Sequence, residues 1–232
     1  MIKSAQAKKL ALNLLSGNWG WVILISLVTT LFATVFTFLT LSATGLGFLL
    51  PFGFQVYNPI FTGFTVVGTI LMFIICLLVN WLVSILGNSI LISLFKLDQY
   101  DEKLPVVNGA LSSLDGDYFI PLLLTTLIKH IYITLWYILL VIPGIIKSYA
   151  YSMTEFIVID ERSKGNQIGY NEAISRSRIL MRGHKWQLFL FDLSFIGWFI
   201  LAGIFGILDL GVRPYFLASR LQFYKSLLEQ AD

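Results

Sequence analysis

The stretch WGWVILISLVTTLFATVFTFLTL, residues 19–41, has no charged side chain and is long enough to cross a lipid bilayer as one helix. A transmembrane helix needs about 20 mostly apolar residues. Trp19 and Trp21 stand at its start, where aromatic side chains are enriched at the membrane interface. No charged residue occurs between Leu10 and Phe95. The stretch therefore predicts a retained transmembrane helix rather than a signal peptide, whose apolar region spans only about 7–15 residues.

The composition of the whole chain supports the same interpretation. Of the 232 residues, 57% are hydrophobic and 12% are charged, and this charged share is about half that of a typical soluble domain. The surface of a soluble domain of this length needs many more charged side chains. The composition therefore argues against a soluble enzyme, a disordered chain or a nucleic-acid-binding domain. It predicts an all-α, polytopic membrane helix bundle.

Later apolar segments extend the prediction to further spans. Gly63–Phe95 supplies a second crossing, and a third runs from about Lys129 to Ile142. We expect residues 118–128 to lie near the membrane interface, because a charge at the centre of a membrane helix costs about 2.5–3.5 kcal/mol on insertion scales. A turn at Pro143-Gly144 then leads into a fourth span, Ile145–Asp160.

Two segments rich in glycine and proline complete the pattern. Thr44–Thr62 is uncharged, and we expect an outer loop that dips into the interface, with a re-entrant functional loop as the alternative. Gln187–Leu228 is longer than one crossing requires. Two crossings with a turn near Gly203–Gly206 account for its length. The prediction is about six transmembrane segments with short Pro/Gly hairpins.

The distribution of charge predicts the orientation. The polar segment Lys96–Asp117 and the basic segment Glu161–Trp186 are both expected in the cytoplasm, so an even number of crossings separates them. The protein is then a multi-pass cell-membrane protein with both termini cytoplasmic. The parts of this single integral membrane domain are a basic cytoplasmic N-terminal segment at 1–18, the first four spans at 19–160, a basic cytoplasmic amphipathic helix at 161–186 and the last two spans at 187–228.

Polar and charged side chains inside the spans are the candidate binding residues. Ionisable residues at this depth are rare and usually face the bundle interior or a water-filled cavity. Spacing places Lys147, Tyr151 and Glu155 on one helix face, and it makes Asp209 and Arg213 an i,i+4 pair. Structural packing is the alternative to a polar solute path or an anionic-substrate site. The candidates are Asn80, Asn88, Lys147, Tyr151, Glu155, Asp209, Arg213 and Arg220.

The amphipathic helix expected within 161–186 carries a basic surface. This surface comprises Arg176, Arg178, Arg182, His184 and Lys185. A basic amphipathic helix lies on an anionic leaflet and gains about 1 kcal/mol for each nearby cation. We therefore expect anionic lipids of the cytoplasmic leaflet as partners, and docking of a membrane protein partner is the alternative.

The sequence contains no enzyme or metal-binding signature. It lacks the His-Glu-x-x-His, Gly-x-Ser-x-Gly and phosphate-loop patterns. Its one cysteine, Cys76, and its two histidines, His130 and His184, do not have metal-ligand spacing. We expect no catalytic residue, metal, cofactor or nucleic-acid partner.

Several segments also resemble a known family in their order and spacing. They are LSGNWG at 15–20, WYILLVIPGIIK at 136–147, YAYSMT at 149–154, EAISRSR at 172–178, LMRGHK at 180–185, LSFIGW at 193–198 and RPY at 213–215. Together they resemble the bacterial integral membrane family catalogued as domain of unknown function 975, most strongly from Trp136 onward. The resemblance implies a multi-pass cytoplasmic-membrane protein and supplies neither an activity nor a catalytic residue.

The expected function is non-enzymatic binding of lipid, a small solute or a membrane partner. Envelope homeostasis, transport and protection against membrane-active peptides all fit this expectation. A secondary transporter is one alternative, and it predicts a cavity lined by Asn80, Asn88, Lys147 and Arg213. A small membrane enzyme acting on lipid is another, and it requires Glu155, Asp209 or His184 to converge on a cavity.

Overall fold

The computed structural model describes residues 4–53, 68, 70, 71, 74, 81 and 85–231, with side chains described at most of these positions. These residues form helices joined by short loops, and none of them forms a β-strand. The predicted all-α fold is confirmed. In chain order the helices are α1 (Ser4–Leu15), α2 (Trp19–Gly53), α4 (Asn88–Tyr100), α5 (Val106–Ala110), η1 (Ser112–Leu114), α6 (Gly116–Leu139), α7 (Val141–Ala150), α8 (Thr154–Ser163), α9 (Tyr170–Leu180), α10 (Lys185–Leu193), α11 (Ile196–Ile204), η2 (Gly206–Leu208) and α12 (Asp209–Ala231).

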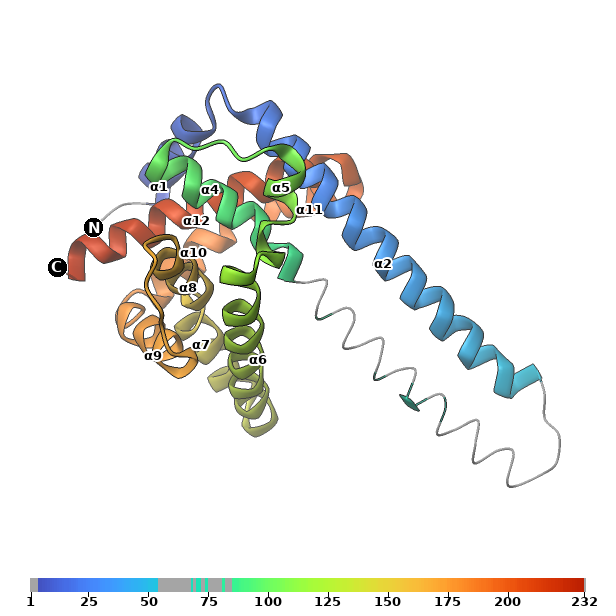
Figure 1. Cartoon of the computed structure of the whole chain (residues 1–232). Coiled ribbons are helices and arrows are strands. Elements are labelled where there is room, and N and C mark those ends of the chain that lie inside the picture. The colour runs from blue at the N-terminus through green and yellow to red at the C-terminus, as the bar shows by residue number, and fades with distance from the viewer. Residues whose placement is uncertain are drawn as a thin grey trace.

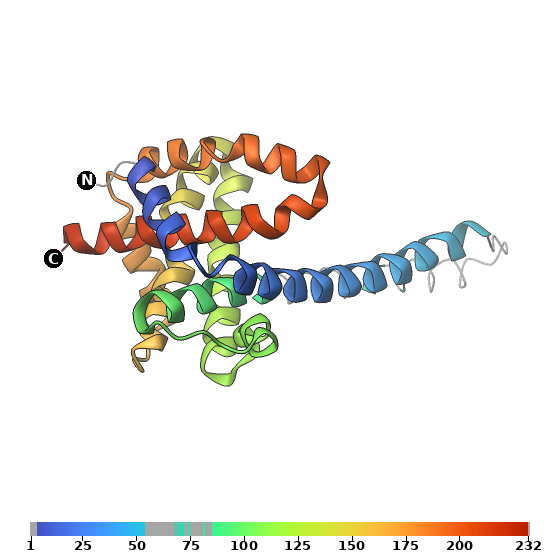
Figure 2. The same ribbon diagram turned by 90° about the horizontal axis from the view of Figure 1, so that it is seen from above.

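The helices form a bundle from which α2 projects (Figure 1). The two ends of the chain lie on the same side of the bundle in both views, opposite the far end of α2 (Figures 1 and 2). The helix α1 turns sharply into α2 at Gly17, whose φ of 79° is readily adopted by glycine. The two helices meet at 94°. This bend lets α1 pack against α12 while α2 leaves the bundle.

The N-terminal segment is part of the core. Ala7, Ala11 and Leu15 recur at i, i+4 and i+8, so they form one stripe of α1, and all three are fully buried. The small alanine side chains allow α1 to approach α12 closely. The expected basic surface segment therefore packs on the bundle through this stripe, and its lysines lie on other faces of the helix.

Aromatic side chains hold the last helix to the rest of the bundle. Phe95 of α4, Phe156 of α8 and Tyr224 of α12 form a triangle with ring centroids 5.7–6.3 Å apart. Closer to the start of α12, Phe191 and Phe195 pack against Phe216. Tilted and edge-on ring pairs at these distances contribute about 0.5–1.5 kcal/mol beyond the burial of their area. Aromatic contacts thus hold α12 to the bundle at two places along its length.

The third and fourth predicted spans form a hairpin whose details differ from the expectation. The helix α6 begins at Gly116 and passes through Lys129 without interruption, whereas the span was expected to start near Lys129. The chain reverses at Leu140, which has extended backbone angles, and Pro143 lies in the first turn of α7. Proline is tolerated there because the first helical N–H groups lack an intrahelical partner.

A break at residues 151–153 divides the expected fourth span into α7 and α8. Ser177 of α9 bridges this break. Its hydroxyl donates to the carbonyl of Ala150 at 3.0 Å and accepts from the amide of Met153 at 3.2 Å. The serine thereby satisfies backbone groups that the break removes from the helical pattern. The amphipathic helix α9 is packed into the bundle through this contact and through Ala173 and Ile174, which are buried.

The last apolar stretch also forms a hairpin. The chain runs through α10 and α11, reverses at Phe205 and η2, and returns as α12 (Figure 2). Phe199 of α11 contacts Phe216 of α12 edge-on, with 5.1 Å between the ring centroids. The turn predicted near Gly203–Gly206 is present.

The expected loops are shorter than predicted. The helix α2 continues to Gly53, beyond the expected end at Leu41, and residues 54–62 lie outside the described part of the chain. The segment Lys96–Asp117 is largely helical, since α4 continues to Tyr100 and α5 and η1 follow. The indole N–H of Trp21 donates to the carbonyl of Leu104 at 2.7 Å and anchors the loop between α4 and α5.

Length and composition identify fewer candidate spans than the sequence predicted. Gly116–Leu139 and Lys185–Ile204 are long and apolar enough to cross a membrane. The bent pair Ala5–Leu15 and Trp19–Val35 counts as a third if it forms one broken span. The described residues therefore contain two or three such helices.

Gly144 permits the close packing of the hairpin formed by α6 and α7. A Cβ atom at this position would lie 2.5 Å from Cδ1 and 2.7 Å from Cγ of Tyr137. Gly144→Ala should therefore lower the unfolding free energy by about 1–2 kcal/mol, since overpacking forces side chains and backbone to shift. Thermal unfolding of the purified protein in detergent measures this loss.

Gly197→Ala is the matched control in α11, where a Cβ atom meets nothing within 4 Å. This variant should be unchanged or slightly more stable, because alanine favours a helix over glycine. Equal effects of the two substitutions would show that the contact with Tyr137 does not limit the hairpin.

Candidate functional site: a charged cavity between the helical hairpins

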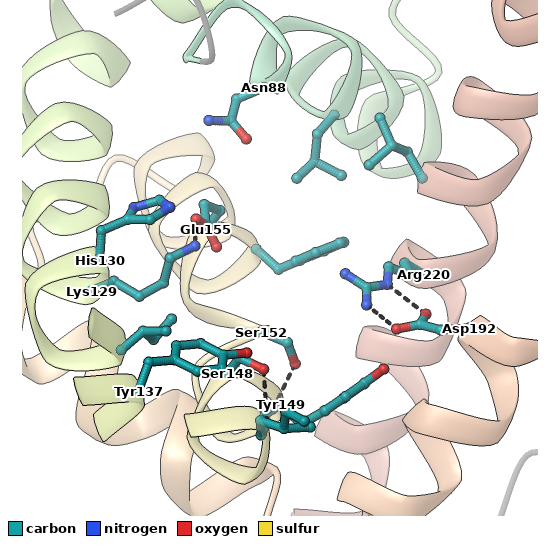
Figure 3. Close-up of a pocket in the computed structure, with 15 residues that line it drawn as sticks. Asn88, Lys129, His130, Tyr137, Ser148, Tyr149, Ser152, Glu155, Asp192 and Arg220 are labelled. Atoms are coloured by element: carbon teal, nitrogen blue, oxygen red, sulfur yellow. Dashed lines mark hydrogen bonds and ion pairs between the residues drawn. The ribbon is translucent and has the colours of Figure 1, made fainter. Parts of the chain in front are cut away.

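An open cavity of about 590 Å³ lies between α6, α7, α8, α10 and α12, with the start of α4 at its rim (Figure 3). Most helical surfaces around it are apolar, yet the cavity itself is lined by many polar side chains. These are Asn88, Lys129, His130, Tyr137, Ser148, Tyr149, Ser152, Glu155, Asp192 and Arg220. A concave site with convergent polar groups is the usual form of a ligand pocket.

An ion pair between Lys129 of α6 and Glu155 of α8 forms one wall of the cavity. Its two side chains are 13% and 15% exposed, so both are largely removed from water. Each charge compensates the other at a depth where an isolated charge is costly. Glu155 also lies in the first turn of α8, where the positive end of the helix dipole stabilises a carboxylate.

A second ion pair forms the opposite wall (Figure 3). The guanidinium of Arg220 on α12 donates to both carboxylate oxygens of Asp192 on α10, from Nε at 3.1 Å and from one terminal nitrogen at 2.5 Å. This two-bond geometry fixes the orientation of both side chains. Arg220 also lies over the ring of Phe216 at 4.8 Å, an arrangement that adds a cation–π contact.

Further polar groups line the cavity beside the two pairs. His130 Nδ1 lies 2.7 Å from the carbonyl of Thr126, which can only accept, so Nδ1 is the donor of this hydrogen bond. In the tautomer with its one proton on Nδ1, Nε2 can accept a hydrogen bond. Ser148 and Ser152 donate to carbonyls of their own helical turns, and their oxygens can accept from a ligand. The amide of Asn88 has no hydrogen-bond partner among the described residues.

The structure brings together three of the predicted candidate residues: Asn88, Glu155 and Arg220 all line the cavity. Asn80 lies outside the described part of the chain. The prediction that Lys147, Tyr151 and Glu155 share one helix face is wrong, because the helix breaks after Ala150.

The remaining span candidates lie away from the cavity lining. Lys147 Nζ is 4.4 Å from the ring centroid of Trp136, and Tyr151 is buried in a small cluster with Ala150 and Ile174. Asp209 and Arg213 do form the predicted i,i+4 pair, at 2.9 Å, in the first turns of α12. Arg220 binds Asp192 and neither of these two residues.

The predicted basic residues lie on and after α9. Arg176 binds Glu161 at 2.9 Å and Glu172 at 2.7 Å, so its charge is compensated locally. Arg178 and Arg182 are exposed, while His184 and Lys185 are half-buried. A second, smaller cavity of about 280 Å³ is lined by Arg176, Arg182 and His184 together with apolar residues.

Sequence reasoning missed Lys129, His130 and Asp192 as site residues. Lys129 was treated only as a cost to membrane insertion, and Asp192 was not singled out. The signal was available in the sequence, since an isolated charge within an apolar helix requires an opposite charge nearby. Which charges pair cannot be predicted from one helix at a time, because each pair joins two different helices.

The three residues required by an enzyme acting on lipid do not converge. Glu155 lines the large cavity, His184 lines the smaller one, and Asp209 is paired with Arg213. Of the residues expected to line a transporter's cavity, Asn88 lines the large cavity, Lys147 and Arg213 do not, and Asn80 lies outside the described residues.

The Asp192–Arg220 pair gives a stability test of the cavity wall. Asp192→Leu should destabilise the protein by about 3 kcal/mol, because it leaves the guanidinium in a largely buried site without its carboxylate. The double substitution Asp192→Leu/Arg220→Met should recover most of this loss, because two apolar side chains replace the whole pair. Denaturant unfolding in micelles measures both. A double variant that is as unstable as the single variant would contradict a charge-balance role for this pair.

Comparison with known proteins gives one match. No curated protein and no solved structure matches the chain. Residues 137–231 match the model of the family described as protein of unknown function (DUF975). This segment begins one residue after Trp136, from which the motifs resemble the family most strongly, so the match confirms the resemblance.

Proposed function

We propose that the protein is a non-enzymatic, multi-pass membrane protein that binds a polar ligand, a small solute or a lipid headgroup, in the charged cavity. The observation that supports this most directly is that two ion pairs, Lys129–Glu155 and Asp192–Arg220, lie on opposite walls of one open cavity. Four charged side chains from four helices meet at this place in an otherwise apolar bundle.

Stability alone is a weak reason for such an arrangement. Replacing a buried ion pair by apolar residues of similar volume is often neutral or stabilising. Ionisable residues within membrane helices commonly mark a binding site or a solute pathway. The unpartnered amide of Asn88 and the accepting nitrogen of His130 add hydrogen-bonding capacity that the described residues do not use. A ligand would use this capacity.

The topology that we propose has six spans in three hairpins. The first hairpin would comprise α2 and the chain that leads to α4, the second α6 with α7 and α8, and the third α10 and α11 with α12. The turns of the second and third hairpins are apolar and exposed, with Ile138 and Ile207 each 78% exposed. Such turns suit a lipid environment, and the common side of both termini suits an even number of crossings.

The basic residues would then face the cytoplasmic leaflet. Ile179 and Trp186 are 61% and 68% exposed and lie close in sequence to the exposed cations Arg178 and Arg182. Exposed apolar and basic side chains together favour contact with anionic headgroups. This surface supports anionic lipids as partners in addition to the ligand of the cavity.

The biological setting that we propose is envelope homeostasis, transport or protection against membrane-active peptides. Transport by this protein would require that the cavity opens alternately to the two sides of the membrane. The open cavity between hairpins is the observation that favours a transporter as the second candidate function.

Cysteine labelling tests the six-span topology. In a Cys76→Ser background, single cysteines would replace Leu140 and Ile207 in the hairpin turns, and Lys103 and Arg178 in the expected cytoplasmic parts. A membrane-impermeant maleimide added to intact cells should label only the cysteines at the two turns. Positions 103 and 178 should become reactive after permeabilisation. Hairpin turns that stay unlabelled from both sides would instead indicate hairpins that enter the bilayer without crossing it.

Native mass spectrometry tests binding in the cavity. The full chain, purified in a mild detergent, should retain a stoichiometric small molecule or lipid. Asn88→Phe should reduce this occupancy at least tenfold, since a large ring would occupy the cavity while no hydrogen bond among the described residues is broken.

Asn108→Phe is the matched control for this experiment. Asn108 is exposed on α5 and does not line the cavity, so its substitution should leave ligand retention unchanged. Retention that survives Asn88→Phe would place the bound molecule elsewhere and would argue against this function.

A further inference from the structure

The charges that line the large cavity sum to zero. Lys129 and Arg220 contribute two positive charges, and Glu155 and Asp192 contribute two negative charges. The other polar groups of the lining are an amide, hydroxyls and the imidazole of His130, which are not counted in this sum. Each of the four charges faces one opposite charge, so the two ion pairs balance each other electrically.

This balance disfavours a ligand that carries one net charge. In a site of low dielectric, an added anion is repelled by the carboxylate of each pair, and an added cation is repelled by each cation. Either ligand would also leave an uncompensated charge in a largely apolar bundle. A ligand with one positive and one negative group keeps the sum at zero and can interact with both walls at once.

The geometry of the two pairs leaves specific groups available. Asp192 accepts from Nε and one terminal nitrogen of Arg220, so the second terminal nitrogen has no partner among the described residues. In Figure 3 this nitrogen points into the cavity. On the other wall, one carboxylate oxygen of Glu155 binds Lys129, and its second oxygen has no hydrogen-bond partner among the described residues.

We propose that the ligand of this cavity is a zwitterion. Its ammonium group would bind the second carboxylate oxygen of Glu155 together with Asn88, and its phosphate or carboxylate would bind the outward terminal nitrogen of Arg220. This inference rests on the proposed function, because it names the class of ligand for the same site. A phosphoethanolamine lipid headgroup and a free amino acid share this chemistry.

Binding of four probes to the full chain in detergent tests the proposal by calorimetry. Glycerophosphoethanolamine and alanine are the zwitterions, glycerophosphoglycerol is the anion, and ethanolamine is the cation. At least one zwitterion should bind ten or more times more tightly than the anion and the cation. Preference for glycerophosphoethanolamine would identify a lipid headgroup as the source, and preference for alanine would identify a free solute.

Three variants connect the result with the cavity. Asn88→Phe should abolish zwitterion binding, and Asn108→Phe should preserve it. Glu155→Gln should reverse the preference in favour of the anion, since it removes one negative charge and leaves Lys129 without its carboxylate. Thermal unfolding of each variant verifies that it is folded.

The possible failures are distinguishable. The anion or the cation could bind as tightly as the zwitterions and lose this binding in Asn88→Phe. That result would overturn the zwitterion proposal, but the cavity would remain a ligand site. If none of the four probes shows binding that Asn88→Phe weakens, the zwitterion proposal is overturned as well. The native mass spectrum would then decide separately whether the cavity holds some other molecule.

Discussion

The mutual neutralisation of charges between helices is the constraint on which the rest of this structure depends. Lys129 lies within a helix that is long and apolar enough to cross a membrane, and Asp192 lies within the next such segment. Each is tolerated because a partner from another helix, Glu155 or Arg220, approaches it. Each pair holds two helices of one hairpin together, and all four charged side chains line the cavity.

The fold could be predicted from sequence where the signal was local. Long uncharged stretches predicted the helices, and glycine near residues 203–206 predicted the last turn. The prediction was less accurate where tertiary contacts compensate the energetic cost of a charge or a break within a helix. Lys129 was expected to delay the start of a span, yet the helix continues because Glu155 neutralises the charge. The break after Ala150 was not foreseen, because its backbone groups are satisfied by a serine on a different helix.

The candidate site was predictable only in part for the same reason. Asn88, Glu155 and Arg220 were recognised as polar residues inside apolar segments, which is a property of each segment alone. The ion-pair partners of Glu155 and Arg220 depend on how the helices pack against one another. Lys147 and Arg213 have the same local signature, but Lys147 lies over Trp136 and Arg213 binds a neighbour on its own helix. The match to the DUF975 family spans residues 137–231, which include Glu155, Asp192 and Arg220, whereas Lys129 and Asn88 lie outside it.

The serine bridge at the break between α7 and α8 links the cavity mechanically to the surface helix α9. Ser177 holds both sides of the break, and Ser152 within it and Glu155 just after it line the cavity. A displacement of α9 by about one hydrogen-bond length would release two backbone groups and free α8 to rotate relative to α7. The carboxylate of Glu155 would move with that rotation. If a ligand in the cavity favours one position of Glu155, the same ligand would favour one position of α9, and the coupling would be reciprocal.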